Sequence, residues 1–178
     1  MSGDEPANCL GFPAWAARVP GDKNQKADGS GMISQKAKYA LRALAALARA
    51  DNKRPMLIAE IAEQQKIPKK FLEQILLDLK HRGLVMSKRG KEGGYLLLKP
   101  ASEITFGEIL RMIDGPIAPL PCLSQTAYRK CDDCLSEQEC EIRHVFARVA
   151  EATREVLFSA TIADTLNEKN RAAVMLAG

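Results

Sequence analysis

The sequence predicts a mainly α-helical fold with one small β-hairpin and a long C-terminal helix. Apolar residues recur at helical spacing from Ala37 to Ala48 and again from Phe71 to Leu79, which indicates amphipathic helices. Two short strand-like runs flank a glycine-rich turn at residues 88–94, and this pattern is typical of a hairpin. A third apolar stripe begins at Ile142 and continues far toward the C-terminus.

Three helices are expected in the first half of the chain. The first lies near residues 34–49, and a shorter amphipathic helix follows at 57–65. The third covers 68–80, with Pro68 at its first position, where proline is tolerated. Gly83 supplies the left-handed conformation that ends it. The tight turn between the second and third helices predicts a helix-turn-helix.

The strand-like runs at residues 84–87 and 95–98 come directly after this helix pair. Between them the chain reads KRGKEGG, a turn that is both basic and rich in glycine. A hairpin in this place is the wing of a winged helix-turn-helix, and a basic wing tip can reach a sugar-phosphate backbone. The alternative is a solvated turn whose charges only maintain solubility.

Two capping-box patterns predict the remaining helices. Thr105 with Glu108 starts a helix over residues 106–113. Ser136 with Glu139 starts the last helix, whose apolar stripe extends to about Leu166. Some thirty helical residues would be about 45 Å long. A domain of this size cannot cover such a stripe, so we expect it to pack against a second copy in a two-fold dimer, with burial inside one chain as the alternative.

Charge is distributed unevenly along the 178 residues. The net charge is only +4, but residues 1–31 carry −1, residues 32–100 carry +9 and residues 101–178 carry −4. The basic middle segment indicates a polyanionic partner. No apolar run is long enough to span a membrane and the first residues lack a signal-peptide core, so we expect a cytoplasmic protein.

These patterns divide the chain into four parts. Residues 1–31 are expected to be a disordered leader, and Met32, which opens the patterned sequence, is the hypothetical natural start. A DNA-binding domain at 32–100 precedes a cysteine loop and dimerisation helix at 101–166, and a flexible tail occupies 167–178.

The opening turns of the 68–80 helix carry the candidate base-reading residues. Lys69 and Lys70 can neutralise phosphates, which supplies affinity without sequence selectivity. Gln74 can pair with adenine, and Glu73 can accept a hydrogen bond from the cytosine amino group. The alternative is that Glu73 and Gln74 are ordinary exposed helix residues.

Four cysteines within nineteen residues form the second candidate site. Cys122, Cys131, Cys134 and Cys140 have the spacing C-x8-C-x2-C-x5-C, and His144 follows. In a reducing compartment such crowding favours a metal centre over structural disulfides. The spacing is compatible with an iron–sulfur cluster or a closed zinc site and does not separate them. Free thiols or a switching disulfide are the alternative without a metal.

A thiol-disulfide enzyme is disfavoured. Cys131 and Cys134 have the C-x2-C spacing of such active sites, but the strand-helix framework around a thioredoxin-like motif is missing from the sequence. Asp132 and Asp133 would also disfavour the thiolate. We therefore predict that the protein is not an enzyme.

From about Met32 to Leu166 the sequence resembles the IscR/NsrR family of bacterial winged-helix transcription regulators. The resemblance rests on KAKYALRALAALA from Lys36, on the stretch from Phe71 that begins FLEQILLDLKHRGLVMSKRGKEGGYLLL, and on the cysteine loop before a long helix. It implies a homodimer that binds palindromic promoter sites and carries an iron–sulfur cluster that reports redox state, nitric oxide or iron supply.

The resemblance also implies roles for individual residues. DNA contacts are expected from the 68–80 helix and the wing, at Lys69, Lys70, Phe71, Glu73, Gln74, Lys88, Arg89, Gly90, Lys91 and Tyr95. Familiar members carry three cysteines, the last two separated by five residues, plus a fourth ligand of another kind. Cys134 and Cys140 keep that spacing, but Cys131 is additional and His144 lies one residue further along.

Two ligand sets therefore stay open: all four cysteines, or three cysteines with His144 or a residue of the partner subunit. The leading hypothesis is a repressor with a 2Fe-2S or 4Fe-4S cluster, and zinc or a thiol switch is the alternative.

Overall fold

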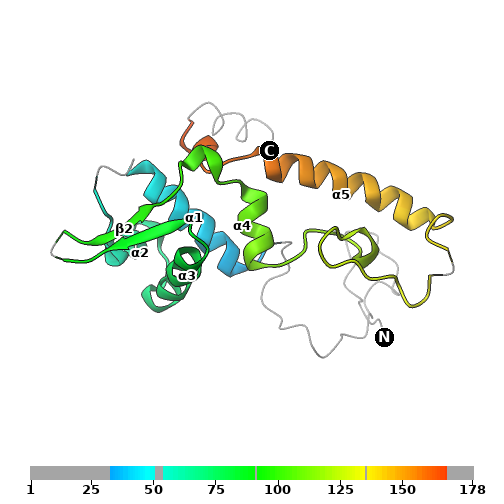
Figure 1. The fold of residues 1–178 in the computed structure, drawn as a ribbon, viewed down its shortest axis with the longest axis horizontal. Coiled ribbons are helices and arrows are strands. Elements are labelled where there is room, and N and C mark those ends of the chain that lie inside the picture. The colour runs from blue at the N-terminus through cyan, green and yellow to red at the C-terminus, as the bar shows by residue number, and fades with distance from the viewer. Residues whose placement is uncertain (1–32, 51–53, 91, 135, 168–178) are drawn as a thin grey trace, which may run out of the picture. The chain divides into compact units, whose positions relative to one another are not determined.

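The structure is a computed structural model that describes residues 33–50, 54–90, 92–134 and 136–167 (Figure 1). The expected leader at 1–31 lies outside these residues, as do Lys91 and all but the first residue of the expected tail at 167–178. In the described part, five α-helices accompany one two-stranded antiparallel sheet, which confirms the mainly helical fold with a small hairpin. None of the described helices is long and apolar enough to cross a lipid bilayer.

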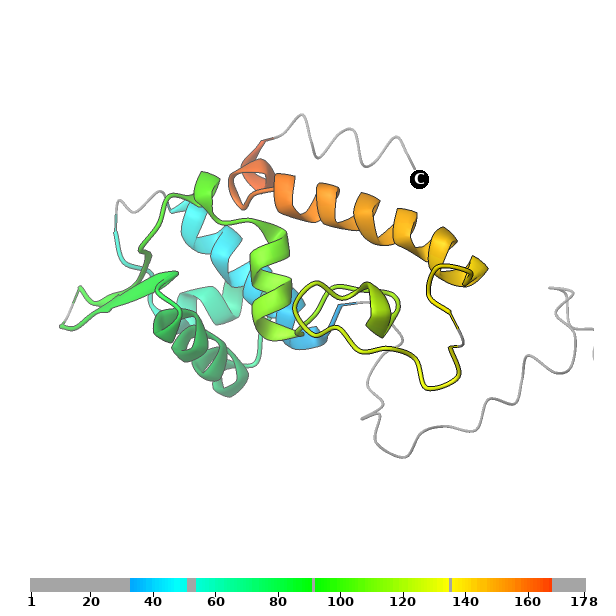
Figure 2. The ribbon, with the colours of Figure 1, turned by 45° about the vertical axis from the view of Figure 1, so that its right-hand side comes forward.

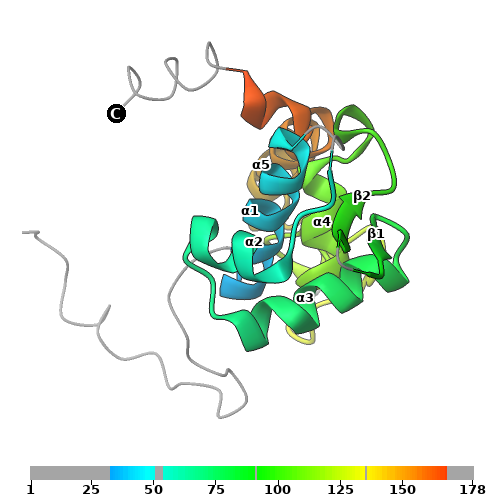
Figure 3. The same ribbon diagram turned by 90° about the vertical axis from the view of Figure 1, so that its left-hand side faces the viewer.

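Helix α1 (Gln35–Arg49) lies at the centre of the bundle, with α2 (Ile58–Gln65), α3 (Lys69–His81) and α4 (Phe106–Ile113) around it (Figure 3). Ser34 caps α1, because its hydroxyl oxygen accepts a hydrogen bond from the Ala37 N–H at 3.1 Å. The three predicted helices are confirmed, and each of their ends lies within one residue of the predicted position.

The turn of the helix-turn-helix depends on two residues between α2 and α3. Lys66 has a left-handed backbone, with φ 51° and ψ 48°, and ends α2. Pro68 is the residue before α3, one position earlier than predicted. Its carbonyl accepts hydrogen bonds from the Phe71 and Leu72 N–H groups, both at 3.0 Å, so it closes the first turn of α3.

The wing consists of β1 (Val85–Lys88) and β2 (Gly94–Leu97), within one residue of the predicted strands. Val85 pairs with Leu97 and Lys88 with Gly94. The other edge of β2 is also bonded, because Met56 and Tyr95 exchange two backbone hydrogen bonds of 3.0 and 2.8 Å. The segment before α2 therefore fixes the wing to the helical bundle.

A short 3₁₀ turn, η2 (Ala101–Glu103), leads from the wing to α4, and the capping box predicted there is confirmed. The Thr105 hydroxyl accepts from the Glu108 N–H, and the Glu108 carboxylate accepts from the Thr105 N–H, both at 3.2 Å. After α4 the chain turns at Gly115, whose φ is +90°, into the loop that carries the cysteines.

The second predicted capping box is wrong. Helix α5 (Glu141–Ser159) begins five residues after Ser136. The Ser136 hydroxyl donates to the Gln138 side chain at 3.3 Å, and the backbone of Cys140 is extended, so no helical turn forms before Glu141.

Helix α5 is also shorter than predicted, because it ends at Ser159 and not near Leu166. Ala160 is extended, and its carbonyl accepts from the Phe106 N–H at 2.9 Å, while the Ile162 N–H donates to Ile104 at 2.8 Å. The chain thus leaves the helix to pair with the segment before α4, and η4 (Ala163–Leu166) is a separate turn. The nineteen residues of α5 span about 28 Å.

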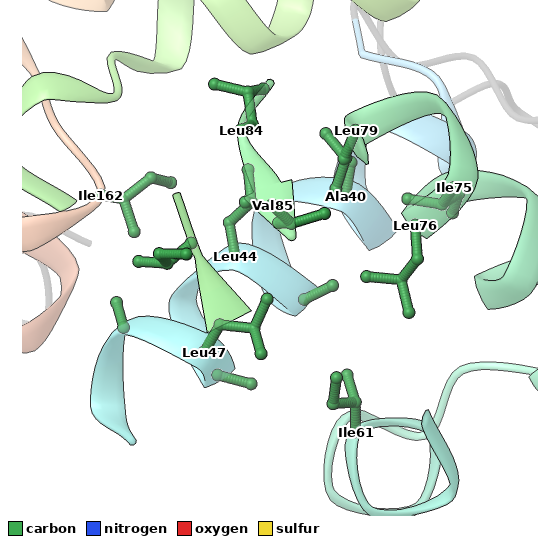
Figure 4. Packing of buried hydrophobic residues seen from close by; sticks show 14 of the residues in the cluster. Ala40, Leu44, Leu47, Ile61, Ile75, Leu76, Leu79, Leu84, Val85 and Ile162 are labelled. Atoms are coloured by element: carbon green, nitrogen blue, oxygen red, sulfur yellow. The ribbon is translucent and has the colours of Figure 1, made fainter. Parts of the chain in front are cut away.

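The core lies among α1, α2, α3, α4 and the wing (Figure 4). Leu44 and Leu47 of α1 face Ile75, Leu76 and Leu79 of α3, and all five are at most 1% exposed. A residue beyond α5 completes this core, since Ile162 is fully buried in it. Packing of this kind is the main source of helix stability in a bundle, so the position of α3 depends on it.

Candidate functional site

The first face of the candidate site is the outer side of α3. The helix has an apolar stripe that packs inward, so residues between the stripe positions must point to solvent. Lys69, Lys70, Glu73 and Gln74 are all exposed on its first two turns. The structure therefore brings two cations and two hydrogen-bonding side chains together on one exposed helix surface, as predicted.

Phe71 differs from these four residues. Its ring is 40% exposed and packs edge-on against Tyr39 of α1, with ring centroids 5.7 Å apart and an interplanar angle of 78°. Such aromatic contacts stabilise the packing of two elements. Phe71 thus braces the start of α3 against α1 and leaves only part of its ring available for a partner.

The wing tip forms the second face. Lys88, Arg89 and Gly90 are exposed there, and Gly90 has a φ of +111°. Tyr95 is half-buried and lies at the base of the wing, where its backbone bonds Met56. The tip can therefore reach a partner with its cations, while Tyr95 anchors the strands behind it.

One hydrogen bond links α3 to the wing, the two elements that carry these faces. The ammonium of Lys80, in the last turn of α3, donates to the Ser87 hydroxyl on β1 at 2.7 Å. It fixes the end of the helix to the strand that leads to the wing tip. Lys80 was not among the predicted site residues, and its sequence context shows no signal that separates it from other exposed lysines.

The loop after α4 runs back beside α5 before it joins the start of that helix (Figure 2). The four predicted cysteines line one hollow of about 520 Å³ there. Cys122, in η3 (Pro121–Leu123), is buried, and Cys131, Cys134 and Cys140 are half-buried. Cys131 lies beside Cys122 and Cys134 beside Cys140, so the thiols are grouped as two neighbouring pairs. The structure thus gathers distant positions of the sequence into one thiol cluster.

Desolvation among the neighbouring side chains raises the pKa of the Cys131 thiol, and the adjacent Cys122 raises it further. Desolvation likewise raises the pKa of Cys134, with Cys140 as the next cause. Both groups are therefore protonated thiols at neutral pH in the metal-free state.

The donor chemistry of this cluster fits a soft metal centre, since thiolates are the ligands of iron–sulfur clusters and of structural zinc. Within the described residues, no three cysteine, histidine or acidic side chains are arranged so that they could hold a metal ion without moving. The paired thiols would have to converge. His144 does not line the hollow, and its Nε2 lies 2.8 Å from the Gln138 carbonyl oxygen.

A polar network braces the loop from outside the thiol cluster. The Tyr128 hydroxyl donates to the Glu137 carboxylate, which also faces the Arg143 guanidinium of α5 at 3.6 Å. The hydrogen bond to Glu137 raises the pKa of Tyr128. None of these three residues is among the predicted site residues, because isolated polar residues carry no periodic signal.

A family model described as "Rrf2: Iron-dependent Transcriptional regulator" matches residues 33–168. An rrf2-like HTH-type transcriptional regulator of Rhodobacter capsulatus is 51% identical over 148 residues, which cover 82% of this chain and 99% of that protein.

Two solved structures are similar as well. CymR, the global cysteine regulator of Bacillus subtilis, has a TM-score of 0.63 and 32% identity, over 75% of this chain and 94% of that one. IscR of T. potens has a TM-score of 0.61 and 31% identity, over 79% of this chain and 89% of that one.

Proposed function

The chain belongs to the Rrf2 family of transcriptional regulators, and from this premise we propose that it is a cytoplasmic, homodimeric repressor whose cysteine loop holds an iron–sulfur cluster. The family regulates transcription and binds DNA, and its members are not enzymes. The proposal adds which residues read the operator, what the loop senses and how two copies combine.

The exposed face of α3 is the observation that carries the DNA-binding part of the proposal. In this assignment α3 enters the major groove, where Glu73 and Gln74 contact base edges. Lys69 and Lys70 contact phosphates beside them. Lys88 and Arg89 reach the adjacent backbone or minor groove from the wing tip, so contacts come from two elements that Lys80 and Ser87 join.

Two variants test this assignment in operator binding. Glu73→Ala should change the preferred base at one position of the operator by about 1 to 3 kcal/mol, and Arg89→Ala should weaken all sequences alike and lower the salt slope by about one. Binding is measured by fluorescence anisotropy on a set of single-base operator variants at several salt concentrations.

Glu63→Ala on α2 and Arg148→Ala on α5 are the matched controls, since both side chains are exposed and lie outside the assigned faces. Unchanged base preference in Glu73→Ala together with unchanged affinity in Arg89→Ala would remove the assigned interface.

The thiol cluster supports the sensory part of the proposal. All four cysteines line one hollow and His144 does not, which favours the four-cysteine ligand set over the set with His144. A bound 2Fe-2S or 4Fe-4S cluster would supply reactivity toward oxidants, nitric oxide or iron shortage. The chain's own part is to supply four cysteine sulfurs and to bring the two pairs together.

That convergence would move residues between α4 and α5, and α4 packs on α1 of the DNA-binding part. A change in the loop could thus alter the spacing of the two recognition helices in a dimer.

Anaerobic purification tests the cluster. Iron–sulfur protein is brown with visible absorption, whereas a structural zinc site gives colourless protein with stoichiometric zinc. Iron and sulfide analysis of Cys122→Ser, Cys131→Ser, Cys134→Ser and Cys140→Ser should show loss of iron in each, while His144→Ala should keep it. Iron retained in Cys131→Ser but lost in His144→Ala would favour the three-cysteine set.

The pairing of the thiols favours a second candidate, a disulfide switch without a metal. In it, one hydrogen peroxide oxidises one pair: two S–H bonds break, one S–S bond forms, and the peroxide is reduced to two waters. Peptide mapping after peroxide treatment should then find Cys122–Cys131 and Cys134–Cys140 and no other combination. Mixed pairings would exclude this switch.

A further inference from the structure

A second hollow, separate from the thiol cluster, lies where α4, α5 and the chain between them meet. Its volume is about 170 Å³, and it is lined by Leu110 of α4, by Asp114 directly after α4, by residues 115–119, and by Val149, Ala150 and Thr153 of α5, among others. We infer that it is a binding site for a small, neutral, apolar molecule of the size of a monocyclic aromatic ring.

The chemistry of the lining selects the ligand class. Asp114 is the single ionisable residue around the hollow, and both of its carboxylate oxygens are engaged by Ser34, which donates its N–H at 2.9 Å and also its hydroxyl. Most other lining groups are aliphatic, and Pro116 and Pro119 have no N–H. The hollow opens to solvent at Pro116, Pro119 and Val149, which are exposed, and most of its lining offers water no hydrogen-bond partner.

The volume of the hollow also fits a small apolar ligand. An apolar cavity of about 150 Å³ in another protein stays dry and binds benzene or xenon. Ala150 lines the hollow with a single methyl group and is only 1% exposed, so a larger side chain there would have to extend into the hollow or displace its neighbours. A charged ligand would have to bury its charge beside the Asp114 carboxylate, which disfavours anions.

One wall of the hollow is able to adjust. The backbone hydrogen bonds of the described loops include none from residues 115–119, and Gly115 begins this wall with a left-handed backbone. A molecule in the hollow would contact α4, α5 and the beginning of the cysteine loop at once. This inference does not depend on the proposed sensor, because it needs no metal and no operator.

Titration of the full-length reduced protein with benzene, followed by two-dimensional NMR, tests the inference. Saturable shifts should be confined to residues around the hollow, and benzoate should bind at least tenfold more weakly. Ala150→Leu fills the space and should weaken benzene at least tenfold. Ala59→Leu adds the same group at an exposed position of α2 and should change nothing.

If Ala150→Leu does not fold, Thr153→Ile narrows the same hollow and should have the same effect. The inference is overturned if benzene gives no saturable shifts, if benzoate binds equally well, or if the filling variant binds benzene like the native chain. One further result would overturn the inference: the filling variant has a higher melting temperature than the native chain, and the native chain does not bind benzene. It would show that the hollow is only a packing defect.

Discussion

Gly94 is the residue at which the wing meets the segment before α2. Its φ is +148°, and a Cβ atom placed there would lie 2.5 Å from the Met56 carbonyl oxygen. No side chain can occupy that space unless the backbone bonds between Met56 and Tyr95 break. The absence of a side chain at Gly94 therefore allows the backbone hydrogen bonds that fix the wing to the bundle.

We predict that Gly94→Ala destabilises the protein by about 3 kcal/mol, since it combines backbone strain with a backbone clash. Gly90→Ala is the matched comparison, because Gly90 also has positive φ but nothing lies within 4 Å of an added Cβ. It should cost only about 1 kcal/mol. Urea unfolding followed by circular dichroism measures both; equal losses would show that the contact with Met56 is unimportant.

Asp164 makes a contribution to folding stability that depends on pH. Hydrogen bonds from the Thr161 N–H at 2.7 Å and the Thr161 hydroxyl at 2.8 Å lower its pKa from 3.8. A lowered folded-state pKa means that the stabilisation is complete above the unfolded pKa and is lost as the pH falls through the folded value.

We therefore predict that Asp164→Ala is less stable than the native chain at pH 6, and that the difference shrinks as the pH falls below about 3.8. Urea midpoints of both proteins at several pH values check this. A difference that grows toward low pH would contradict the assigned hydrogen bonds.

At the scale of elements, η4 is held to the bundle by one buried side chain. Ile162 is fully buried in the core, whereas Leu166 at the end of η4 is 38% exposed. We predict that Ile162→Ala costs about 3 kcal/mol and Leu166→Ala less than about 1 kcal/mol. Differential scanning calorimetry of the two variants measures the contrast. Similar losses would show that η4 does not depend on Ile162.

Local signals predicted most elements, and long-range pairing accounts for the wrong end predicted for α5. The capping box at Thr105 and the glycine at Gly83 act within a few residues, so α4 and the end of α3 follow from the sequence. The end of α5 depends on Ile104 and Phe106, which lie more than fifty residues away, and no periodicity could show that pairing. Ser136 has the residue type and spacing of a cap, but its hydroxyl bonds the Gln138 side chain instead of a helix N–H.

The same division holds for the candidate site. The exposed positions of α3 follow directly from its apolar stripe, so Glu73 and Gln74 could be placed from the sequence. The cysteine spacing predicted a shared site, but it could not show that the thiols form two pairs, since that depends on how the loop folds. The hydrogen bond between Tyr128 and Glu137 likewise depends on the folded loop and has no signal in the sequence.

At the scale of the whole molecule, α5 presents an apolar face with no partner among the described residues. Ile142, Val145, Val149 and Val156 are between 47% and 64% exposed and recur at intervals of three, four and seven residues along one side of the helix. Exposed apolar patches of this kind mark protein–protein contacts. A two-fold partner would cover the stripe and place two recognition helices on one operator.

We predict that Val145→Asp combined with Val156→Asp converts a dimer to a monomer, because each carboxylate would lose its water in the interface. Light scattering at micromolar concentration measures the change. Affinity for a two-half-site operator should fall about 100-fold, while binding to a single half-site should stay the same, since only the linked second contact is lost. Arg148→Asp, on the charged side of α5, controls for added charge. A native chain that is monomeric, or a double variant that stays dimeric, would contradict the role assigned to this face.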